Sequence, residues 1–249
     1  MSVVLTAHAL STTLSDRDRR FRLRADGFEL RSGEVVSLFG QSGSGKTLLL
    51  EMLALLRRPE PNGTYVAEID GEPFDFASLW IDRAGRSALP ELRSRLFGFV
   101  PQSGSLLPFL TTTENIVVAQ ALTNQPDLAY VEHLIDRLGL GQVRAQRSSE
   151  LSIGQRQRTA VARALAHRPA IVIADEPTAS LDPEAADTVL QLFLELALEG
   201  GCAVLLSSHD TPRVDALRLR KRFRVQVSPA GTEPGLVESR LVVEAEAAA

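Results

Sequence analysis

Cysteine is nearly absent from this sequence of 249 residues, in which Cys202 is the only one. A single cysteine excludes an intrachain disulfide framework and a multi-cysteine zinc site, and it is typical of proteins from a reducing compartment. Because the apolar residues 203–206 follow it, we expect Cys202 to be a small buried residue rather than a reactive thiol.

Long apolar runs and a basic excess are also missing. No stretch approaches the roughly 18 apolar residues of a membrane span, and residues 1–16 lack the basic and apolar regions of a secretory leader. The formal net charge is -4, so no general basic field draws the chain to nucleic acid. We therefore expect a cytoplasmic protein that binds no nucleic acid and reaches a membrane only through a partner.

Lysine is scarce as well, since nearly all basic residues are arginine and the only lysines are Lys46 and Lys221. Lys46 belongs to the stretch GQSGSGKT, which matches the phosphate-binding loop G-x-x-x-x-G-K-[ST] between an apolar strand and a helix. Its glycines let backbone N–H groups converge on phosphate oxygens, Lys46 adds a positive charge, and Thr47 offers Mg²⁺ a hydroxyl. The pattern predicts a nucleoside triphosphate site formed by Gly40, Gln41, Ser42, Gly43, Ser44, Gly45, Lys46 and Thr47.

A second chemical signal is the apolar stretch IVIADE at residues 171–176, which ends in two acids. Asp175 stands at the end of the predicted strand, where a carboxylate can hold the shell of a Mg²⁺ ion. Glu176 follows it beyond the sheet edge, where a carboxylate can polarise an attacking water molecule. The stretch therefore predicts that the end of this strand carries a Mg²⁺-binding and a water-polarising carboxylate.

Apolar β-rich segments alternate with helical segments along most of the chain, which predicts an α/β fold with a mostly parallel sheet. Residues 2–10 and 19–35 alternate apolar and polar side chains, which indicates an antiparallel β flank. We expect one domain over residues 1–249, with a P-loop NTPase (RecA-like) core at 1–102 and 155–249 and an inserted α-helical subdomain at 103–154.

Several local predictions accompany this fold. Thr113 is expected to cap a helix over residues 113–122, and residues 83–87 are expected to form a turn. Two C-terminal segments, 221–231 and 235–243, are expected to add edge strands. Across residues 216–227, alternation of basic and apolar residues favours a half-solvated strand over a nucleic-acid or lipid patch. One apolar helix stripe is predicted from Leu128, Val131, Leu134, Ile135 and Leu138.

Taken together, the motifs resemble those of the nucleotide-binding subunit of ATP-binding cassette (ABC) transporters. The wording is closest to the lipoprotein-releasing and macrolide-exporter subgroup. The resemblance covers about residues 28–212. The matching stretches, in the family's order, are GQSGSGKT (40–47), FVPQ (99–102), LSIGQRQR (151–158), IVIADEPTASLD (171–182) and SSHD (207–210).

The resemblance implies a role for each matching residue. Gln102 would touch Mg²⁺ or the attacking water and sense the membrane partner, and His209 would contact the γ-phosphate of ATP. Asp182 lies in a loop that would cross to a second subunit. The resemblance therefore implies a Mg²⁺-dependent ATPase that powers a membrane transporter or a mechanically coupled membrane complex.

The stretch LSIGQ also implies a dimer. In the family, residues at the positions of Ser152, Gly154 and Gln155 contact the ATP that the opposite subunit holds. Two ATP molecules are then enclosed between two cassettes. We therefore expect this single cassette to form a homodimer, or to pair with a related cassette, beside a transmembrane subunit.

This sequence departs from the family at two places. Ile153 replaces a usual glycine, and no aromatic residue stands where the family stacks adenine; Phe21 is more typical of a core residue, and Arg19 or Arg20 offers a guanidinium plane instead. We expect a working element with altered packing at the dimer seam. The alternatives are a regulatory cassette with impaired hydrolysis and a soluble cassette that acts on DNA or ribosomes.

Overall fold

The computed structural model describes residues 3–16, 19–217, 219, 221–228 and 235–244. The chain divides into two compact units, of which unit 1 comprises residues 1–89 and 205–249 and unit 2 comprises residues 90–204. Within the described ranges, none of the helices combines the length and the hydropathy that crossing a membrane requires.

Unit 1 contains a small sheet in which every neighbouring pair of strands is antiparallel, in the order β4-β1-β6-β7. The turn between β6 and β7 consists of Asp70 and Gly71, both with positive φ (53° and 79°), as a two-residue hairpin requires. The predicted antiparallel flank is confirmed. Its strands are β1 (Val3–His8), β4 (Phe28–Arg31), β6 (Thr64–Ile69) and β7 (Glu72–Asp75).

The larger sheet of unit 1 follows the order β2-β3-β12-β11-β5-β10. Strand β12 runs parallel to β3 and β11 runs parallel to β5, whereas β2 and β3, and β11 and β12, are antiparallel. Residues 203 and 204 of β10 fall in unit 2. The strands are β2 (Leu10–Asp16), β3 (Arg19–Ala25), β5 (Val35–Phe39), β10 (Ala203–Ser208), β11 (Lys221–Val227) and β12 (Leu236–Glu244).

The C-terminal strands β11 and β12 therefore lie inside this sheet, between β3 and β5. The prediction of edge strands is wrong because each has a hydrogen-bonded neighbour on both sides. Phe223 and Val225 of β11 are buried, as interior strand residues should be. Of the alternating residues 216–227, Leu217 ends helix α8 and residues 221–227 form β11, while residues 218 and 220 lie outside the described part of the chain.

The helices of unit 1 are α1 (Lys46–Leu53), α2 (Phe76–Leu79) and α8 (Thr211–Ala216), and α3 (Arg83–Leu96) crosses the limit of the unit. The predicted turn at 83–87 is wrong because these residues begin α3. Asp82 Oδ1 accepts a hydrogen bond from Gly85 N (2.7 Å), which stabilises the start of the helix. Gly85 is required by close packing rather than by a turn, since a Cβ there would lie 2.6 Å from Leu79 O.

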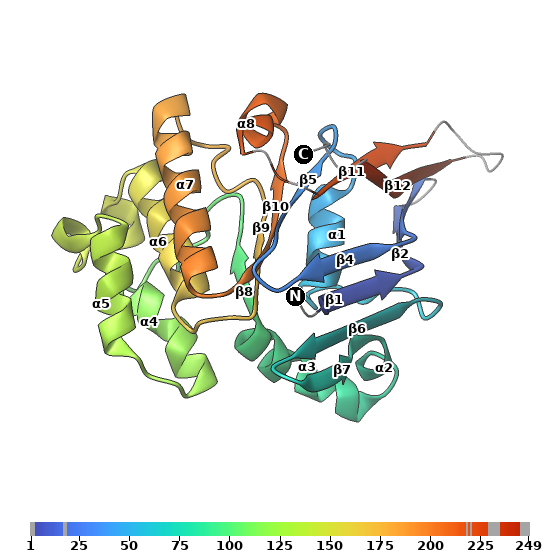
Figure 1. The fold of residues 1–249 in the computed structure, drawn as a ribbon, viewed down its shortest axis with the longest axis horizontal. Coiled ribbons are helices and arrows are strands. Elements are labelled where there is room, and N and C mark those ends of the chain that lie inside the picture. The colour runs from blue at the N-terminus through green and yellow to red at the C-terminus, as the bar shows by residue number, and fades with distance from the viewer. Residues whose placement is uncertain (1–2, 17–18, 218, 220, 229–234, 245–249) are drawn as a thin grey trace. The chain divides into compact units, whose positions relative to one another are not determined.

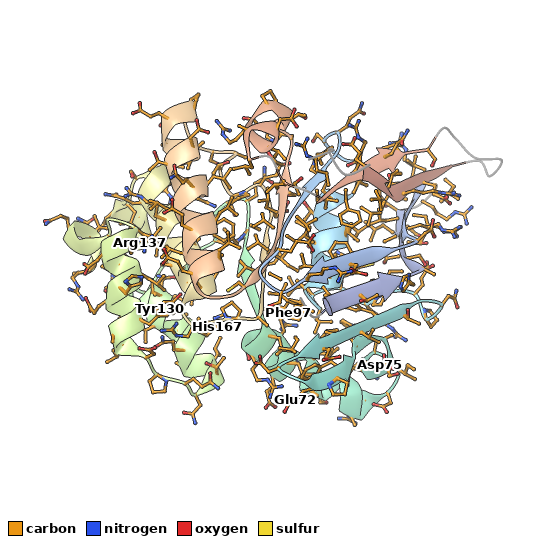
Figure 2. The ribbon with its side chains drawn as sticks, in the orientation of Figure 1. Glu72, Asp75, Phe97, Tyr130, Arg137 and His167 are labelled. Atoms are coloured by element: carbon orange, nitrogen blue, oxygen red, sulfur yellow. The ribbon has the colours of Figure 1, made fainter. Side chains whose placement is uncertain are left out.

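Unit 2 contains two parallel strands, β8 (Phe97–Val100) and β9 (Ile171–Ala174), and a helical insert between them in the sequence (Figure 1). The expected α/β fold with an inserted helical region is confirmed. Arg137 of α5, which Figure 2 labels, donates to both carboxylate oxygens of Glu199 (2.9 and 3.1 Å) and so joins α5 to α7. The helical elements are α4 (Thr112–Thr123), α5 (Leu128–Arg137), α6 (Ile153–Leu165), α7 (Pro183–Glu199), and the 3-10 turns Gly141–Val143 and Ser148–Glu150.

Two helix predictions in unit 2 need correction. Helix α4 is capped by Thr111, not Thr113, because Thr111 and Glu114 form a reciprocal capping box. In the apolar stripe of α5, Val131, Leu134, Ile135 and Leu138 are buried, but Leu128 is 64% exposed because it is the first residue of the helix.

Cys202 is 2% exposed, which confirms that it is a buried core residue. Its thiol donates to Pro169 O (3.0 Å), and burial raises its pKa to about 11. At neutral pH the side chain is therefore a protonated thiol with little nucleophilic character.

Candidate functional site

The loop of residues 40–47 joins β5 to α1 in unit 1, as the sequence predicted. Gly43 and Gly45 have φ values of 76° and 101°, a region that glycine adopts without strain. Gly45 is also the N-cap of α1, so the N–H groups of the first helical turn follow the loop directly. These groups carry the positive end of the helix dipole, which favours an anion.

Gly40 fixes the beginning of this loop against β11. A Cβ atom at position 40 would lie 2.5 Å from Val225 O and 2.8 Å from Ser44 Oγ. No real side chain tolerates the first of these contacts, so glycine is required by close approach to a backbone carbonyl.

Lys46 lies with its ammonium group over the start of the loop. Its Nζ atom donates to Gly40 O (2.9 Å) and Gln41 O (3.3 Å), and the residue is 6% exposed. Ser44 Oγ is buried and, within the part of the chain that the structure describes, makes no hydrogen bond. A buried cation, an unsatisfied hydroxyl and a helix N-terminus fit the phosphate chain of a nucleotide.

The remaining loop positions of the predicted site, Gln41, Ser42 and Thr47, are exposed. His209 also belongs to unit 1, where it is exposed and lies between the end of β10 at Ser208 and the cap of α8. Asp210, the next residue, caps α8 by accepting from Arg213 N (3.1 Å).

Phe21 is half-buried on β3 rather than deep in the core. Its ring lies against the phosphate-binding loop, because a Cβ on Gly45 would be 3.0 Å from Phe21 Cζ. This packing was not foreseen from the alternation of apolar residues along β3.

Unit 2 carries the acidic end of β9. Asp175 follows this fully buried strand directly, is 5% exposed, and its N–H donates to Val100 O (2.8 Å). Glu176, the next residue, has a φ of 46°, which is unusual for a residue other than glycine. The positive φ turns the chain out of the strand direction immediately after Asp175.

Gln102 and Glu176 lie together, although 74 positions separate them in the sequence. Gln102 Nε2 donates to Glu176 Oε2 at 3.5 Å. Gln102 stands in a tight turn that follows β8 and is closed by a hydrogen bond from Gly104 N to Pro101 O (3.1 Å). The parallel pairing of β8 with β9 explains this proximity, since both strands end at the same edge.

The stretch LSIGQ forms the start of α6. Ser152 is the N-cap, and its Oγ accepts from Gln155 N (3.2 Å), while Gln155 Oε1 accepts from Ser152 N (2.8 Å). Ile153 is the first helical residue and is 50% exposed. Gly154 has room for a side chain within the chain itself, since a Cβ there would lie 3.8 Å from Leu181 Cδ2, its nearest neighbour.

Asp182 caps α7, because its Oδ1 accepts from Ala185 N (3.0 Å). The predicted site residues thus divide between the units. Unit 1 holds residues 40–47 and His209, and unit 2 holds Gln102, Ser152, Gly154, Gln155, Asp175, Glu176 and Asp182.

One residue of this region was missed by the sequence analysis. Arg163, near the end of α6, donates to the carbonyls of Ser105 (Nη1, 3.1 Å) and Gly104 (Nη2, 3.4 Å). Both carbonyls belong to residues 101–105, which we call the Gln102 turn. The only signal of Arg163 in the sequence is a charge within the apolar run AVARAL, which marks a cation on a mostly buried part of a helix.

Comparison with known proteins shows the family to which this chain is similar. Residues 23–179 match the ABC transporter family. The lipoprotein-releasing system ATP-binding protein LolD of Anaeromyxobacter dehalogenans is 41% identical over 187 residues, which are 74% of each chain. LolD of Novosphingobium aromaticivorans is 42% identical over 192 residues, 76% of this chain and 81% of the relative.

Solved structures of ATP-binding cassettes resemble the fold of this chain. The dimeric, post-hydrolysis ATP-binding cassette MJ0796, bound to ADP and Pi, is 26% identical with a TM-score of 0.74, covering 94% of this chain and 96% of that one. The cassette cbiO1 of Clostridium perfringens, part of the ABC transporter complex cbiONQ, shares the fold with a TM-score of 0.71 at 24% identity, over 95% of this chain and 87% of that one. This chain therefore belongs to the ABC transporter family and is one of its ATP-binding, ATP-hydrolysing cassettes.

Proposed function

We propose that this cassette powers a membrane transporter of the lipoprotein-releasing kind, as one of two cassettes attached to a transmembrane partner at the cytoplasmic face of the membrane. Identities of 41% and 42% to two LolD proteins support the subgroup. A dimeric cassette among the solved structures supports the pairing. The cargo would be a lipid-modified protein, as the name of those relatives indicates.

The phosphate-binding loop would hold the triphosphate of ATP. Lys46 would turn its ammonium group from the loop carbonyls toward phosphate oxygens, and Ser44 Oγ, which makes no hydrogen bond within the described part of the chain, would gain a partner. Backbone N–H groups of Gly43, Gly45 and the first turn of α1 would supply further donors. His209 would add a donor to the γ-phosphate.

Mg²⁺ would be held by Thr47, Asp175 and Gln102. When bound, the ion neutralises charge on the β and γ phosphates during transfer. Asp175 suits this role because a nearly buried carboxylate at a strand end is held in place by the strand before it. The oxygen donors of a hydroxyl, a carboxylate and an amide are those that Mg²⁺ prefers.

The observation that carries the hydrolytic role is the contact between Gln102 and Glu176. Glu176 would accept a hydrogen bond from the attacking water and polarise it toward the γ-phosphorus. The amide of Gln102 would keep the Glu176 side chain turned to the water. The water oxygen would bond to the γ-phosphorus while the bond from that phosphorus to the bridging oxygen breaks. The bonding electron pair would leave with ADP, and the water proton would pass through Glu176 to the released phosphate.

The start of α6 would contact the ATP of the second cassette. Ser152 Oγ accepts from Gln155 N, which leaves the hydroxyl proton able to donate to a phosphate. Gly154 would let the partner's nucleotide approach, since a Cβ there would make only an ordinary contact, 3.8 Å from Leu181 Cδ2, within the described part of the chain. Asp182 and its loop would extend the same surface toward the partner.

Affinity purification of the tagged chain from detergent-solubilised membranes tests this proposal. We expect a transmembrane protein to co-purify and the complex to hydrolyse ATP in the presence of Mg²⁺. Recovery of ribosomes or DNA without any membrane protein would support a soluble cassette instead. A membrane complex that binds ATP but does not hydrolyse it would support a regulatory cassette.

A further inference from the structure

Arg163 places a positive charge where burial makes it energetically unfavourable. It lies half-buried near the C-terminal end of α6, and burial lowers the pKa of its guanidinium. Of the residues that the structure describes, none forms an ion pair with it. A desolvated cation without a carboxylate needs other polar partners to be tolerated.

Those partners are two backbone carbonyls of the Gln102 turn. Arg163 Nη1 donates to Ser105 O at 3.1 Å, and Nη2 reaches Gly104 O at 3.4 Å. The planar guanidinium can reach adjacent carbonyls at once because its N–H groups form a fixed fork. Arg163 therefore binds the backbone of one short loop.

The same loop also rests on a second residue of α6. Gly104 is buried and has a φ of 73°, and a Cβ there would lie 3.4 Å from Gln157 Oε1. Gln157 is 5% exposed. Gln157 and Arg163, about 1.7 turns apart on α6, thus both lie against the turn that presents Gln102.

We propose that Arg163 is a positioning residue, which holds the Gln102 turn on α6 so that Gln102 reaches Glu176. This inference rests on the role proposed above for Gln102. The turn has few restraints of its own: the Gly104 N to Pro101 O bond and a 2.7 Å contact between the hydroxyls of Ser103 and Ser105. The carbonyl contacts of Arg163 attach it to a regular helix.

Helix α6 then connects two parts of the catalytic cycle. Its first end is the Ser152 cap, and Arg163 lies eleven residues later, about 16 Å along a regular helix. A displacement of the Ser152 end by the ATP of a second cassette would move Arg163 as part of one rigid element. Dimer closure would in this way set the distance between Gln102 and Glu176.

The test compares Arg163→Met and Arg163→Lys with the native full-length chain in its membrane complex. We expect kcat for ATP hydrolysis to fall between about 10-fold and 100-fold in Arg163→Met, because a misplaced catalytic group costs that much. KM for ATP should change less than about twofold, since the phosphate-binding loop is untouched. Arg163→Lys should be intermediate, because one ammonium replaces the fork.

Arg168→Met is the matched control, because Arg168 follows the same helix but pairs with Asp127 (3.2 Å) and lies over the Tyr130 ring. It should leave kcat within about twofold of the native value. If both variants lower kcat equally, loss of helix stability explains the effect and the positioning role is overturned.

A double-substitution cycle with Gln102→Ala separates the two proposals. If Arg163 acts through Gln102, adding Arg163→Met to Gln102→Ala should lower kcat by less than about twofold more. Fully multiplicative effects would overturn the positioning role of Arg163, while full activity of Gln102→Ala alone would overturn the role of Gln102 and this inference with it.

Amide hydrogen exchange provides a readout that does not depend on activity. Amide exchange of residues 102–105 should rise about tenfold in Arg163→Met, and exchange of residues 40–47 should stay unchanged. If Arg163→Met does not fold, the same comparison with Arg163→Lys decides the question. Unchanged exchange in residues 102–105 would contradict the proposal.

Discussion

Ser152 and Gln155 hold each other at the start of α6 through a pair of hydrogen bonds, 3.2 Å from Gln155 N to Ser152 Oγ and 2.8 Å from Ser152 N to Gln155 Oε1. Both bonds form with isoleucine at position 153. The side chain of Ile153 is 50% exposed and takes no part in the cap. The departure from the family's glycine therefore leaves the local geometry of this motif intact.

For this reason, Ile153→Gly should change ATP turnover by less than about threefold. It should lower the free energy of unfolding by about 0.5 kcal/mol, because glycine has the poorer helix propensity. Turnover by phosphate release and thermal unfolding measure the two effects. Ser152→Ala is the contrasting variant, expected to cost about 1 kcal/mol through loss of the cap and to reduce turnover as well. If the native chain has almost no ATPase activity and Ile153→Gly restores it, the motif is damaged in the native chain.

Glu176→Gln should lower kcat by about 100-fold or more, since the amide cannot polarise water as the carboxylate does. ATP binding should persist, so ATP-bound dimers should accumulate. Phosphate release and size-exclusion chromatography with ATP measure these effects. Glu132→Gln changes an exposed carboxylate paired with Arg144 and serves as the control. Full turnover in Glu176→Gln would show that another group activates the water.

Lys46→Met should weaken ATP binding by more than about tenfold, because a charge-assisted bond to phosphate is worth on the order of 1.5–3 kcal/mol. Titration with a fluorescent ATP analogue gives the dissociation constant. Arg57→Met removes a cation that pairs with Glu51 on the surface of the same unit, and it should bind as the native chain does. If Lys46→Met binds ATP as tightly as the native chain, the loop of residues 40–47 is not the phosphate-binding site.

Gly40→Ala should destabilise the chain by about 1–3 kcal/mol, the usual cost of forcing an atom into a packed region. The cause is the 2.5 Å approach of the new Cβ to Val225 O. Denaturant unfolding measures the loss. Gly141→Ala is a suitable control, since a Cβ there meets nothing within 4 Å. An equally stable Gly40→Ala variant would mean that β11 can move away from the loop.

The buried thiol of Cys202 should make stability fall at alkaline pH. Its pKa is raised by burial from 9.0 to about 11, so the unfolded chain loses this proton first. The contribution is fully present below pH 9.0 and is lost as the pH rises toward about 11, at up to ~1.4 kcal/mol per pH unit. Unfolding of Cys202→Ala across this range should show a smaller alkaline loss. Parallel curves would contradict a buried, protonated thiol.

Local chemistry made much of this protein predictable from its sequence. The loop of residues 40–47 and the acid-tipped strand β9 each depend on a few adjacent residues. The errors have local causes too: the run Thr111–Thr112–Thr113 offers three possible caps, and only the box with Glu114 selects the first.

Relations between distant residues could not be predicted from one sequence. Strand β11 pairs with β5 and strand β12 pairs with β3, and both partners lie about 200 positions earlier in the sequence. Nothing in the composition of β11 and β12 identifies these partners. Arg163 reads as one more helical arginine until the fold places it on the carbonyls of Gly104 and Ser105. Pairing of this kind is decided by tertiary packing rather than by propensity.

The position of β11 and β12 between β3 and β5 also sets an order of events on the ribosome. Unit 2 is continuous in sequence, whereas unit 1 needs both residues 1–89 and residues 205–249. While the chain is being translated, β3 and β5 emerge early but lack the two strands that separate them, and Gly40 lacks the Val225 carbonyl against which it packs. Native packing around the nucleotide loop therefore waits for translation to reach the C-terminal strands.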